Sequence, residues 1–322
     1  MVEAVEIKST ELIPGEFIET QVKAIADAVG DGEAINALSG GVDSSVVTML
    51  GHKALRNRLK TYFIDNGVMR KDEPQQIVDM FKPFGVNVQI IDAQDQFFDA
   101  LAGITDPEEK REAITQTFYK DVFGELVKDS GAKYLLQGTI LTDIDETIAG
   151  IKRQHNVFEQ LGIDPQEAFG YKIIEPVVQL RKDGVRKVGE ALGLPESVFN
   201  RMPFPGPALS ARVISEATRE RIKTVRTATS IIEEELAETG AFQYMAILHQ
   251  DKVTGMRDNQ RDFGNQIEIR CWDSVDARVA TPTHLSHETL TRLANRMVTE
   301  VPGVVSVTYN ITSKPPSTME AV

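Results

Sequence analysis

Residues 39–45, with the sequence Ser-Gly-Gly-Val-Asp-Ser-Ser, constrain the fold of this chain more than any other stretch. They follow a short apolar run at 34–38 and precede an apolar helical stripe over 46–50. A buried strand, then small flexible residues, then a helix start is the arrangement of the first βα turn of a parallel sheet. Two consecutive glycines let successive N–H groups turn toward one anion, and the positive end of the following helix points to the same place. The stretch therefore predicts a loop that holds a phosphate chain.

The acidic residue of this loop, Asp43, indicates which kind of phosphate site it forms. The loop lacks both the Lys-Ser/Thr pair of kinases and GTPases and the three spaced glycines of the dinucleotide fingerprint. A carboxylate inside an anion cradle would repel phosphate unless a divalent cation lay between them. We therefore interpret Asp43 as a Mg²⁺ partner that faces a polyphosphate. The alternative is a structural Gly-Gly turn in which Asp43 or Ser44 caps the following helix.

Apolar runs that alternate with helical patterns predict an α/β fold with a doubly wound parallel sheet. Strands that alternate with helices form right-handed βαβ units, and ligands bind beyond the carboxyl ends of such strands. The polar segments 39–45, 65–68 and 137–139 are therefore expected to face one crevice. The predicted strands are 34–38, 61–64, 86–91, 133–136 and 172–174, and the predicted helices are 17–29 and 73–81.

A proline-rich segment at 202–207, Met-Pro-Phe-Pro-Gly-Pro, divides the chain into two predicted domains, residues 1–201 and residues 202–322. Its closely spaced prolines exclude a helix or a central strand. Beyond this segment we expect a smaller α+β domain. Its predicted helices are 215–238 and 287–299, and its predicted strands are 244–248, 267–270 and 304–311.

The composition excludes several classes of protein. A formal net charge of −13 argues against a broad nucleic-acid footprint and against an anionic membrane surface. Cys271 is the single cysteine, so no disulfide can form within the chain, and its strand-like surroundings predict a buried thiol. The first twenty residues lack the apolar core of a signal peptide, and no run of about twenty apolar residues occurs anywhere. We therefore expect a cytoplasmic protein.

Four separated motifs resemble those of one enzyme family. Residues 39–45 are similar to the SGGxDS loop of the N-type ATP pyrophosphatases, which split ATP into AMP and pyrophosphate. Residues 106–111 resemble the DPExKR helix start of GMP synthetase, and residues 203–213 resemble its PFPGPGL…RV signature, with Ala208 in place of the second glycine. Residues 312–320 resemble its terminal SKPPxTxE tail, although this chain ends Glu-Ala-Val where many relatives end Glu-Trp-Glu. The chain is therefore identified as a member of the GMP synthetase family, as its ATP-pyrophosphatase subunit.

The resemblance implies a reaction and a set of site residues. The chain would use ATP and Mg²⁺ to convert xanthosine monophosphate (XMP) to GMP through an adenylyl-XMP intermediate, and it would release AMP and pyrophosphate. The implied ATP-binding residues are Ser39, Gly40, Gly41, Val42, Asp43, Ser44, Ser45, Asp65, Val68, Gln137 and Gly138. The implied XMP-binding residues are Arg111, Arg212, Gln243, Asp258, Arg261, Lys314 and Glu320. The implied catalytic residues are Asp43 and the lid residues Asp143, Glu146 and Lys152, with His155 and Asn156 in the same lid.

The resemblance also implies partners. The phosphate loop begins at Ser39, which leaves no room for the N-terminal glutamine amidotransferase domain of bifunctional relatives. Cys271 lacks the small-residue elbow that exposes a nucleophile. We therefore expect ammonia to come from a separate glutamine amidotransferase subunit, as in the two-subunit archaeal enzymes. In this family the terminal tail enters the active site of a partner subunit, and the second domain is expected to form a homodimer. No nucleic-acid or membrane partner is expected.

Three alternatives stay open at this point. An NAD synthetase or a tRNA thiolase would share the pyrophosphatase loop, but the proline signature and the terminal tail disfavour the first. The single cysteine and the net charge disfavour the second. A non-catalytic nucleotide-binding subunit that only regulates a glutaminase is the third, and the presence of Asp43, Lys152 and Lys314 speaks against it.

Overall fold

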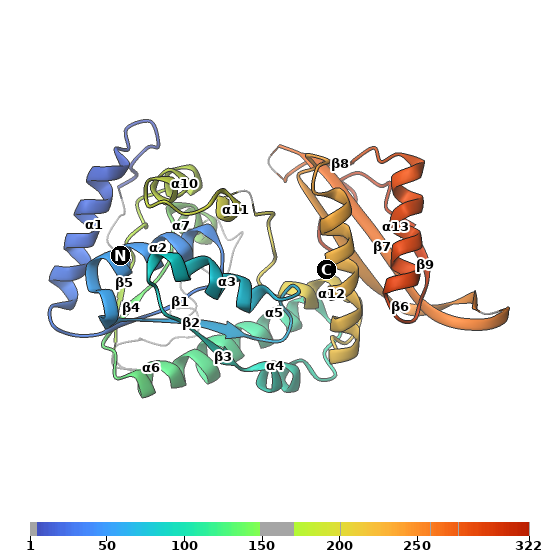
Figure 1. The fold of residues 1–322 in the computed structure, drawn as a ribbon, viewed down its shortest axis with the longest axis horizontal. Helices are drawn as coiled ribbons and strands as arrows, with labels where there is room; N and C mark the ends of the chain where they lie inside the picture. Colours follow the sequence, from blue (N-terminus) through green and yellow to red (C-terminus); the bar gives the residue numbers. More distant parts are fainter. Residues whose placement is uncertain (1–4, 149–170, 200, 258, 276, 322) are drawn as a thin grey trace. The chain divides into compact units, whose positions relative to one another are not determined.

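The computed structural model describes residues 5–148, 171–199, 201–257, 259–275 and 277–321. Two compact units make up the chain, and each has its own sheet (Figure 1). The first unit consists of Met1–Ile64, Pro74–Asp92 and Phe118–Arg201. The second consists of Asp65–Glu73, Ala93–Thr117 and Met202–Val322. Two internal segments that precede the proline-rich region thus belong to the second unit.

The first unit contains a five-stranded parallel sheet with the order β3-β2-β1-β4-β5. β1 lies in the centre, with its Ala34 opposite Leu59 of β2 on one side and opposite Tyr134 of β4 on the other. The order reverses direction between β1 and β4, which makes the ends of these two strands the switch point where ligands bind in such sheets. The predicted α/β class is confirmed. The strands are β1 (Ala34–Ala37), β2 (Leu59–Asp65), β3 (Val88–Asp92), β4 (Tyr134–Leu136) and β5 (Lys172–Ile174).

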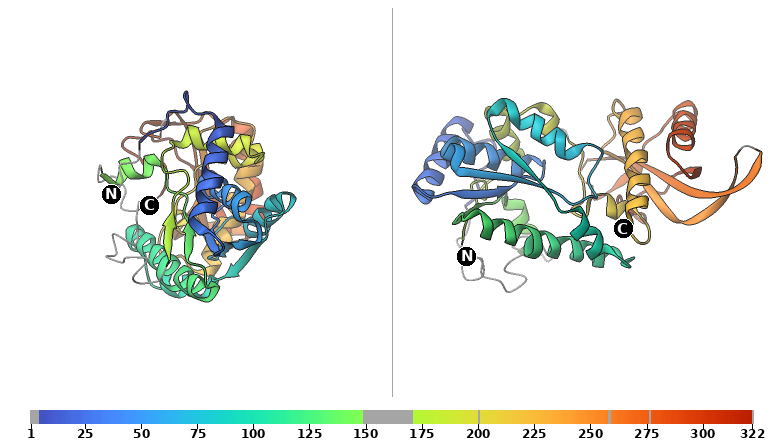
Figure 2. Two further views of the ribbon diagram at one scale, coloured as in Figure 1. Left: turned by 90° about the vertical axis from the view of Figure 1, so that its left-hand side faces the viewer. Right: turned by 60° about the horizontal axis from the view of Figure 1, so that its bottom comes forward.

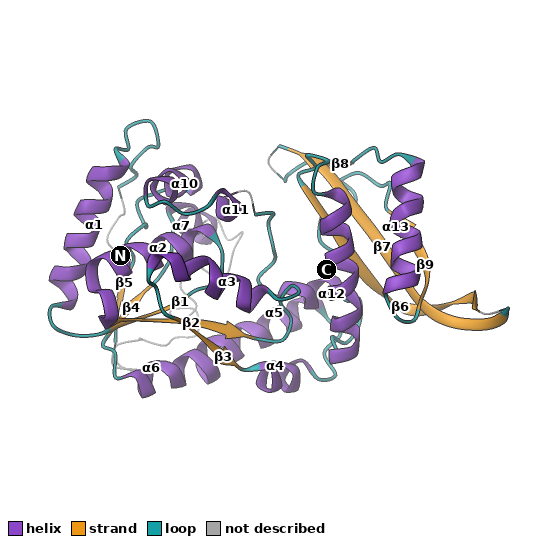
Figure 3. Cartoon of the chain, in the orientation of Figure 1, coloured by secondary structure: helices purple, strands orange, loops and turns teal. Residues whose placement is uncertain are grey.

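Helices lie on both sides of this sheet, as the predicted βαβ pattern requires. α1, α2 and α10 pack against one another, and α6 lies on the opposite side (Figure 3). The apolar stripe of α2 is fully buried, with Val46 and Leu50 both 0% exposed, so this helix is the centre of the core. The helices are α1 (Pro14–Val29), α2 (Val42–Leu55), α3 (Glu73–Phe81), α6 (Gly124–Ser130), α7 (Leu141–Ile148), α10 (Lys182–Ala191) and α11 (Glu196–Phe199). Short 3₁₀ turns occupy Arg56–Arg58 and Lys82–Phe84, and Thr117–Phe123 forms a π-helical segment before α6.

The second unit is built on a long antiparallel ribbon of two strands, β6 (Gln243–Arg257) and β7 (Gln260–Ser274). β8 (Ala280–Pro282) pairs with β7 in antiparallel fashion and β9 (Val304–Tyr309) pairs with it in parallel. α12 (Arg219–Leu236) packs on β6, α13 (His287–Glu300) packs on β9, and the ribbon extends beyond both helices (Figure 2). The unit also contains α4 (Gln94–Leu101), α5 (Pro107–Gln116) and a 3₁₀ segment, η4 (Ala208–Arg212).

Several predicted elements differ from the observed ones for a physical reason. The strand predicted at 244–248 runs from Gln243 to Arg257, and the strand predicted at 267–270 runs from Gln260 to Ser274. The apolar pattern marks only the part that is buried, whereas the distal part pairs as a two-stranded ribbon with exposed side chains. α4 and α10 were not predicted.

Other expectations agree with the structure. Asp106 caps α5, because its carboxylate accepts hydrogen bonds from the N–H groups of Glu108 and Glu109. Cys271 is 1% exposed, and burial raises the pKa of its thiol, which makes it an inert core residue. Among the described helices, none is both long enough and apolar enough to span a membrane.

Candidate functional site

The phosphate loop lies in the first unit, between the end of β1 and the start of α2. Gly41 occupies the N-cap position of α2 without any side-chain cap, so the helix N-terminus is open to a ligand. Gly40 has a φ of +76°, and a Cβ at this position would lie 2.5 Å from Nη1 of Arg201 and 2.7 Å from Cδ1 of Ile77. The same Arg201 nitrogen donates a hydrogen bond of 2.9 Å to the carbonyl oxygen of Gly40. The positive φ therefore favours glycine here, and a Cβ would require the ends of the Arg201 and Ile77 side chains to shift; Arg201 also fixes the loop backbone.

Hydroxyl groups tie the two ends of this loop together. Ser44 Oγ accepts a hydrogen bond from the N–H of Ser39 at 3.2 Å, donates one to the carbonyl of Gly41 at 3.1 Å and lies 2.9 Å from Ser39 Oγ. Ser45 and Val42 are buried, at 0% and 5% exposure, so they support the loop from inside. A phosphate would meet the backbone and the exposed Ser39, while Ser44 closes the turn.

The end of β4 lies against the same helix start. A Cβ on Gly138 would lie 3.2 Å from the backbone nitrogen of Ser44 and 3.3 Å from the carbonyl carbon of Asp43. The glycine thus permits a close approach of the two backbones. Gln137 follows β4, and its Nε2 donates a hydrogen bond to Thr139 Oγ1 at 3.2 Å. The predicted polar segments 39–45 and 137–139 are therefore brought together at the switch point of the sheet.

Asp43 has a cationic neighbour that sequence reasoning missed. Lys182, the first residue of α10, donates a hydrogen bond of 2.6 Å to Asp43 Oδ2. The side chains of Lys182 and Asp43 are 46% and 23% exposed, so both reach solvent at the edge of the loop. The sequence shows two basic residues at 181–182, just after β5. Nothing in the sequence, however, indicates that one of them would contact Asp43.

The single carboxylate of Asp43 is compatible with a magnesium ion that is held mainly by phosphate. Within the described parts of the chain, no group of three or more His, Cys, Asp or Glu side chains could hold a metal. Mg²⁺ does not need such a group, since it is commonly held by one or two carboxylates together with substrate phosphates and water. Asp43 at the phosphate loop supplies one such carboxylate.

Asp65 and Val68, the other predicted ATP-binding residues, belong to the second unit. The Asp65 carboxylate accepts hydrogen bonds of 2.9 Å from the N–H of Gly67 and from Gln94 Nε2, which shapes the turn after β2. Val68 is 0% exposed, and its carbonyl accepts a hydrogen bond from the N–H of Leu209. The two residues therefore have structural partners within their own unit.

Three of the predicted XMP-binding residues meet in the second unit, and we call Arg212, Gln243 and Glu320 the terminal cluster. The Arg212 guanidinium contacts the Glu320 carboxylate through Nε and Nη2, both at 3.3 Å. Gln243 Nε2 donates to Glu320 Oε1 at 2.9 Å and to the carbonyl of Pro203 at 3.2 Å. The side chain of Arg212 is 2% exposed, whereas that of Glu320 is 22% exposed. The guanidinium is therefore buried, and the carboxylate is the part of the pair that solvent reaches.

The proline-rich segment supports this cluster. The ring of Phe204 lies between two guanidinium groups, with its centroid 3.8 Å from Cζ of Arg70 and 4.9 Å from Cζ of Arg212. Such cation–π contacts fix the plane of each guanidinium. Within this chain, Glu320 lies against Arg212 and Gln243.

The structure also describes three other predicted XMP-binding residues, Lys314, Arg111 and Arg261. Lys314 Nζ donates to the carbonyl of Ala277 at 2.8 Å, and Arg111 Nε lies 3.6 Å from Glu108 on its own helix. Arg261 pairs with Met256 near the tip of the ribbon, whereas Gln243 of the terminal cluster pairs with Trp272 at the other end of β7. At about 3.3 Å per residue, Arg261 is roughly 35 Å from the cluster along the strand.

The predicted lid is described only at its start. Asp143 Oδ2 accepts a hydrogen bond of 3.1 Å from the N–H of Ile140, so it caps α7. Glu146 belongs to α7, but its side chain lies outside the described part. Lys152, His155, Asn156 and Asp258 also lie outside the described residues.

A buried lysine that sequence reasoning missed holds the segment that carries Arg212. Lys110 of α5 is 1% exposed, and its ammonium group donates to the carbonyls of Val213, at 2.8 Å, and of Ser215. Burial and the nearby positive charge of Arg221 lower the pKa of Lys110 to about 8, although Asp106 acts in the opposite direction. In the sequence the residue belongs to the DPExKR-like motif, where only Arg111 was assigned a role.

Comparisons with known proteins show which family the chain belongs to. The family model described as GMP synthase C terminal domain matches residues 230–321, and the one described as NAD synthase matches residues 16–117. A GMP synthase [glutamine-hydrolyzing] subunit of Pyrococcus furiosus is 46% identical over 94% of this chain and 96% of the relative. The corresponding subunit of Pyrococcus horikoshii is 46% identical over 95% of this chain and 98% of the relative, and that of Methanopyrus kandleri is 40% identical over 95% and 98%. The resemblance found in the motifs is confirmed, and the chain belongs to this family of GMP synthase [glutamine-hydrolyzing] subunits.

Proposed function

We propose that this chain aminates XMP to GMP at the cost of ATP, which is cleaved to AMP and pyrophosphate. The observation that carries the proposal is the phosphate loop at the switch point between β1 and β4, in a chain of this family. The buried guanidinium–carboxylate cluster of the second unit supports the nucleotide part, because Arg212 and Glu320 offer complementary charges to a phosphate and to a base.

In the first step the C2 oxygen of XMP attacks the α-phosphorus of ATP. A phosphorus–oxygen bond forms, the bond to the β-phosphate breaks, and pyrophosphate leaves. The backbone N–H groups of residues 39–45 and the N-terminus of α2 hold the polyphosphate, and Lys182 adds positive charge at the rim. When bound, Mg²⁺ neutralises charge on the pyrophosphate, and Asp43 would hold it.

In the second step ammonia attacks C2 of the adenylyl-XMP intermediate. The new carbon–nitrogen bond replaces the carbon–oxygen bond, AMP leaves, and one proton is released. The protein has little covalent chemistry to perform here, so alignment of the two nucleotides and exclusion of water determine the rate. Lys152, Asp143 and Glu146 are proposed to complete this enclosure, and Arg111, Asp258 and Lys314 are proposed to contact XMP. Arg261 is too far along the ribbon from the terminal cluster to contact the same nucleotide within one chain.

Ammonia is proposed to come from glutamine hydrolysed by a separate amidotransferase subunit in the cytoplasm. The relatives are named as one subunit of a glutamine-hydrolyzing enzyme, which supports the existence of another. We also propose a homodimer formed through the second unit.

A purified sample tests the proposal directly. The chain is incubated with XMP, Mg-ATP and an ammonium salt, and the products are separated by chromatography. We expect GMP, AMP and pyrophosphate in equal amounts, and we expect glutamine to fail as nitrogen donor until the second subunit is added. Formation of ADP and phosphate, or turnover of ATP that does not depend on XMP, would contradict the proposal.

The match of residues 16–117 to NAD synthase favours one rival, amidation of an adenylated carboxylate. Nicotinic acid adenine dinucleotide in place of XMP distinguishes the two in the same assay. We expect no product from it, because in the proposed reaction the acceptor is the C2 oxygen of a xanthine base, whereas this compound offers a pyridine carboxylate.

A further inference from the structure

One face of the β6–β7 ribbon binds the C-terminal segment of the chain. Side chains on a strand alternate between faces, so directly opposite residues on the two strands share a face. Three such pairs follow one another along the ribbon, and all belong to the same face: Gln243 with Trp272, Met245 with Arg270, and Ile247 with Glu268. This face carries an amide, an indole, a guanidinium and a carboxylate beside two apolar side chains.

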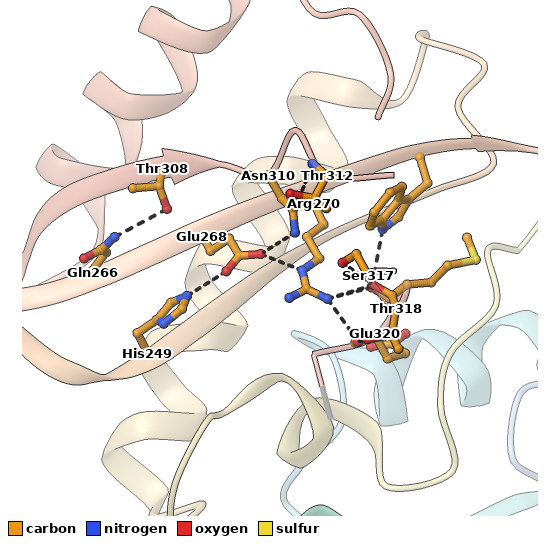
Figure 4. Close-up of polar contacts among 12 residues, drawn as sticks. His249, Gln266, Glu268, Arg270, Thr308, Asn310, Thr312, Ser317, Thr318 and Glu320 are labelled. Carbon is orange, nitrogen blue, oxygen red and sulfur yellow. Dashed lines mark hydrogen bonds and ion pairs between the residues drawn. The ribbon is translucent and has the colours of Figure 1, made fainter. Parts of the chain in front are cut away.

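Residues 318–320 lie on this face and are held by their backbone (Figure 4). Arg270 Nη1 donates to the carbonyl oxygens of Thr318, Met319 and Glu320 at 2.9, 3.4 and 3.0 Å. Trp272 Nε1 donates to the carbonyl of Met319 at 3.3 Å. The Met319 side chain is 6% exposed and packs in a cluster that contains Trp272.

The guanidinium of Arg270 is itself fixed from the opposite direction. Its Nε donates to Glu268 Oε1 at 2.6 Å, and the same carboxylate is contacted by His249 Nε2 at 2.7 Å and by Asn310 Nδ2 at 3.1 Å. His249 lies where the β6–β7 register shifts between Leu248 and Lys252, and such bulges redirect side chains. Burial alone would raise the pKa of Glu268, but the hydrogen bonds from Arg270, His249 and Asn310 lower it, so this carboxylate stays ionised.

We propose that Arg270 is a positioning residue that holds residues 318–320 on the β6–β7 face, so that the Glu320 side chain meets Arg212 and Gln243. Arg270 contacts the backbone of the segment, whereas Glu320 is left to face the nucleotide. The inference rests on the proposed function, in which Glu320 contacts XMP. A lysine could not replace Arg270, because its single nitrogen cannot reach both Glu268 and the carbonyl oxygens in the fixed geometry of a guanidinium.

The first test needs no nucleotide. Trp272 is the only tryptophan, and it contacts Met319, so its emission reports on the docked segment. In Arg270→Lys and Arg270→Met we expect a red-shifted emission and about tenfold or faster hydrogen–deuterium exchange in peptides that cover residues 312–321. Arg292→Lys is the matched control, because it alters another arginine–glutamate pair of the same unit, with Glu235. We expect this control to behave as wild type.

The second test uses the proposed reaction. The KM for XMP should rise by about tenfold or more in Arg270→Lys, because charge-assisted hydrogen bonds that place Glu320 are lost. The kcat and the KM for ATP should change by less than about threefold, since, in the described part of the chain, the Arg270 guanidinium bonds only to Glu268 and to the backbone of residues 318–320. Arg292→Lys should leave all three constants unchanged.

The outcomes distinguish the positioning role of Arg270 from the proposed function of the chain. Unchanged exchange and emission in both Arg270 variants would overturn the positioning role, whatever the activity. Faster exchange with an unchanged KM for XMP would overturn the link between the segment and the XMP site. Failure of wild-type protein to aminate XMP would contradict the proposed function, and the exchange data would then still show whether Arg270 holds the segment.

Discussion

Arg212 and Glu320 are 108 positions apart in the chain, yet the guanidinium of one contacts the carboxylate of the other through two nitrogen atoms at 3.3 Å. Arg212 is almost inaccessible to solvent and Glu320 is partly open. A buried cation needs a partner that compensates its charge, and here the partly exposed carboxylate of Glu320 is that partner. This relationship links the proline-rich segment to the C-terminal tail, two motifs that the sequence presents separately.

Arg212→Met should destabilise the second unit and weaken XMP binding. Removing one partner of a buried ion pair costs about 3–5 kcal/mol, and we expect about 3 kcal/mol because Glu320 is 22% exposed. Guanidinium unfolding followed by Trp272 fluorescence gives the free energy, and equilibrium titration with XMP gives the affinity. Arg219→Met is the control, because its pair with Asp95 is exposed and is worth less than about 1 kcal/mol. Equal losses in the two variants would contradict the assignment.

Gly40→Ala should disturb the phosphate loop far more than Gly131→Ala. Both glycines have positive φ, +76° and +67°, so each substitution costs about 1–2 kcal/mol of backbone strain. Only at Gly40 does a Cβ also collide with Arg201 and Ile77, whereas nothing lies within 4 Å of it at Gly131. We expect an extra loss of about 1–3 kcal/mol and weaker ATP binding in Gly40→Ala. Thermal unfolding by circular dichroism and ATP titration measure these effects, and similar results for both variants would show that the loop tolerates a Cβ.

Lys110 should make stability depend on alkaline pH. Its pKa in the folded state is about 8 against an ordinary value of 10.5, so between these values the unfolded chain binds more protons than the folded chain. The unfolding free energy therefore gains a term that rises with pH across this window, by at most about 1.4 kcal/mol per pH unit. Comparison of wild type with Lys110→Met at pH 8 and pH 10, by Trp272 fluorescence in guanidinium, isolates this term.

We expect the difference in unfolding free energy between pH 8 and pH 10 to be more positive in wild type than in Lys110→Met. Lys252→Met, which removes an exposed lysine of the same unit, serves as the control. Parallel pH profiles for wild type and Lys110→Met would show that Lys110 keeps its proton throughout. A smaller rise in wild type than in the variant would contradict the sign of the shift.

Asp43→Asn should reduce GMP formation by about a hundredfold or more while the fold persists. The neutral amide loses the charge that would hold Mg²⁺ at the loop, and a metal ion supplies several kcal/mol in such reactions. Lys182 loses its charged partner, but this pair is partly exposed and contributes less than about 1 kcal/mol to stability. Pyrophosphate release measured over a range of Mg²⁺ concentrations is the assay. Asp145→Asn, which removes an exposed partner of Arg181, should retain wild-type activity and metal dependence.

Local patterns in the sequence were sufficient for the parallel sheet of the first unit, although not for all of its helices. The alternation of apolar runs and helical stripes indicates a parallel sheet, and consecutive glycines before a helix indicate an anion site at its N-terminus. These signals depend on neighbours along the chain, so they can be read without tertiary structure. The ends of β6 and β7 could not be read in this way, because their distal parts pair with each other without being buried.

The sequence by itself therefore determined the fold class, the family and the phosphate loop, since each depends on short-range spacing or on motifs. Only the tertiary structure decided which side chains meet: Lys182 with Asp43, Lys110 with the segment that carries Arg212, and Arg270 with the backbone of residues 318–320. It also placed Arg261 far from the terminal cluster along the ribbon, and Glu320 beside Arg212 and Gln243. The physical reason is that these contacts join residues far apart in sequence, and their geometry is set by strand register and helix packing.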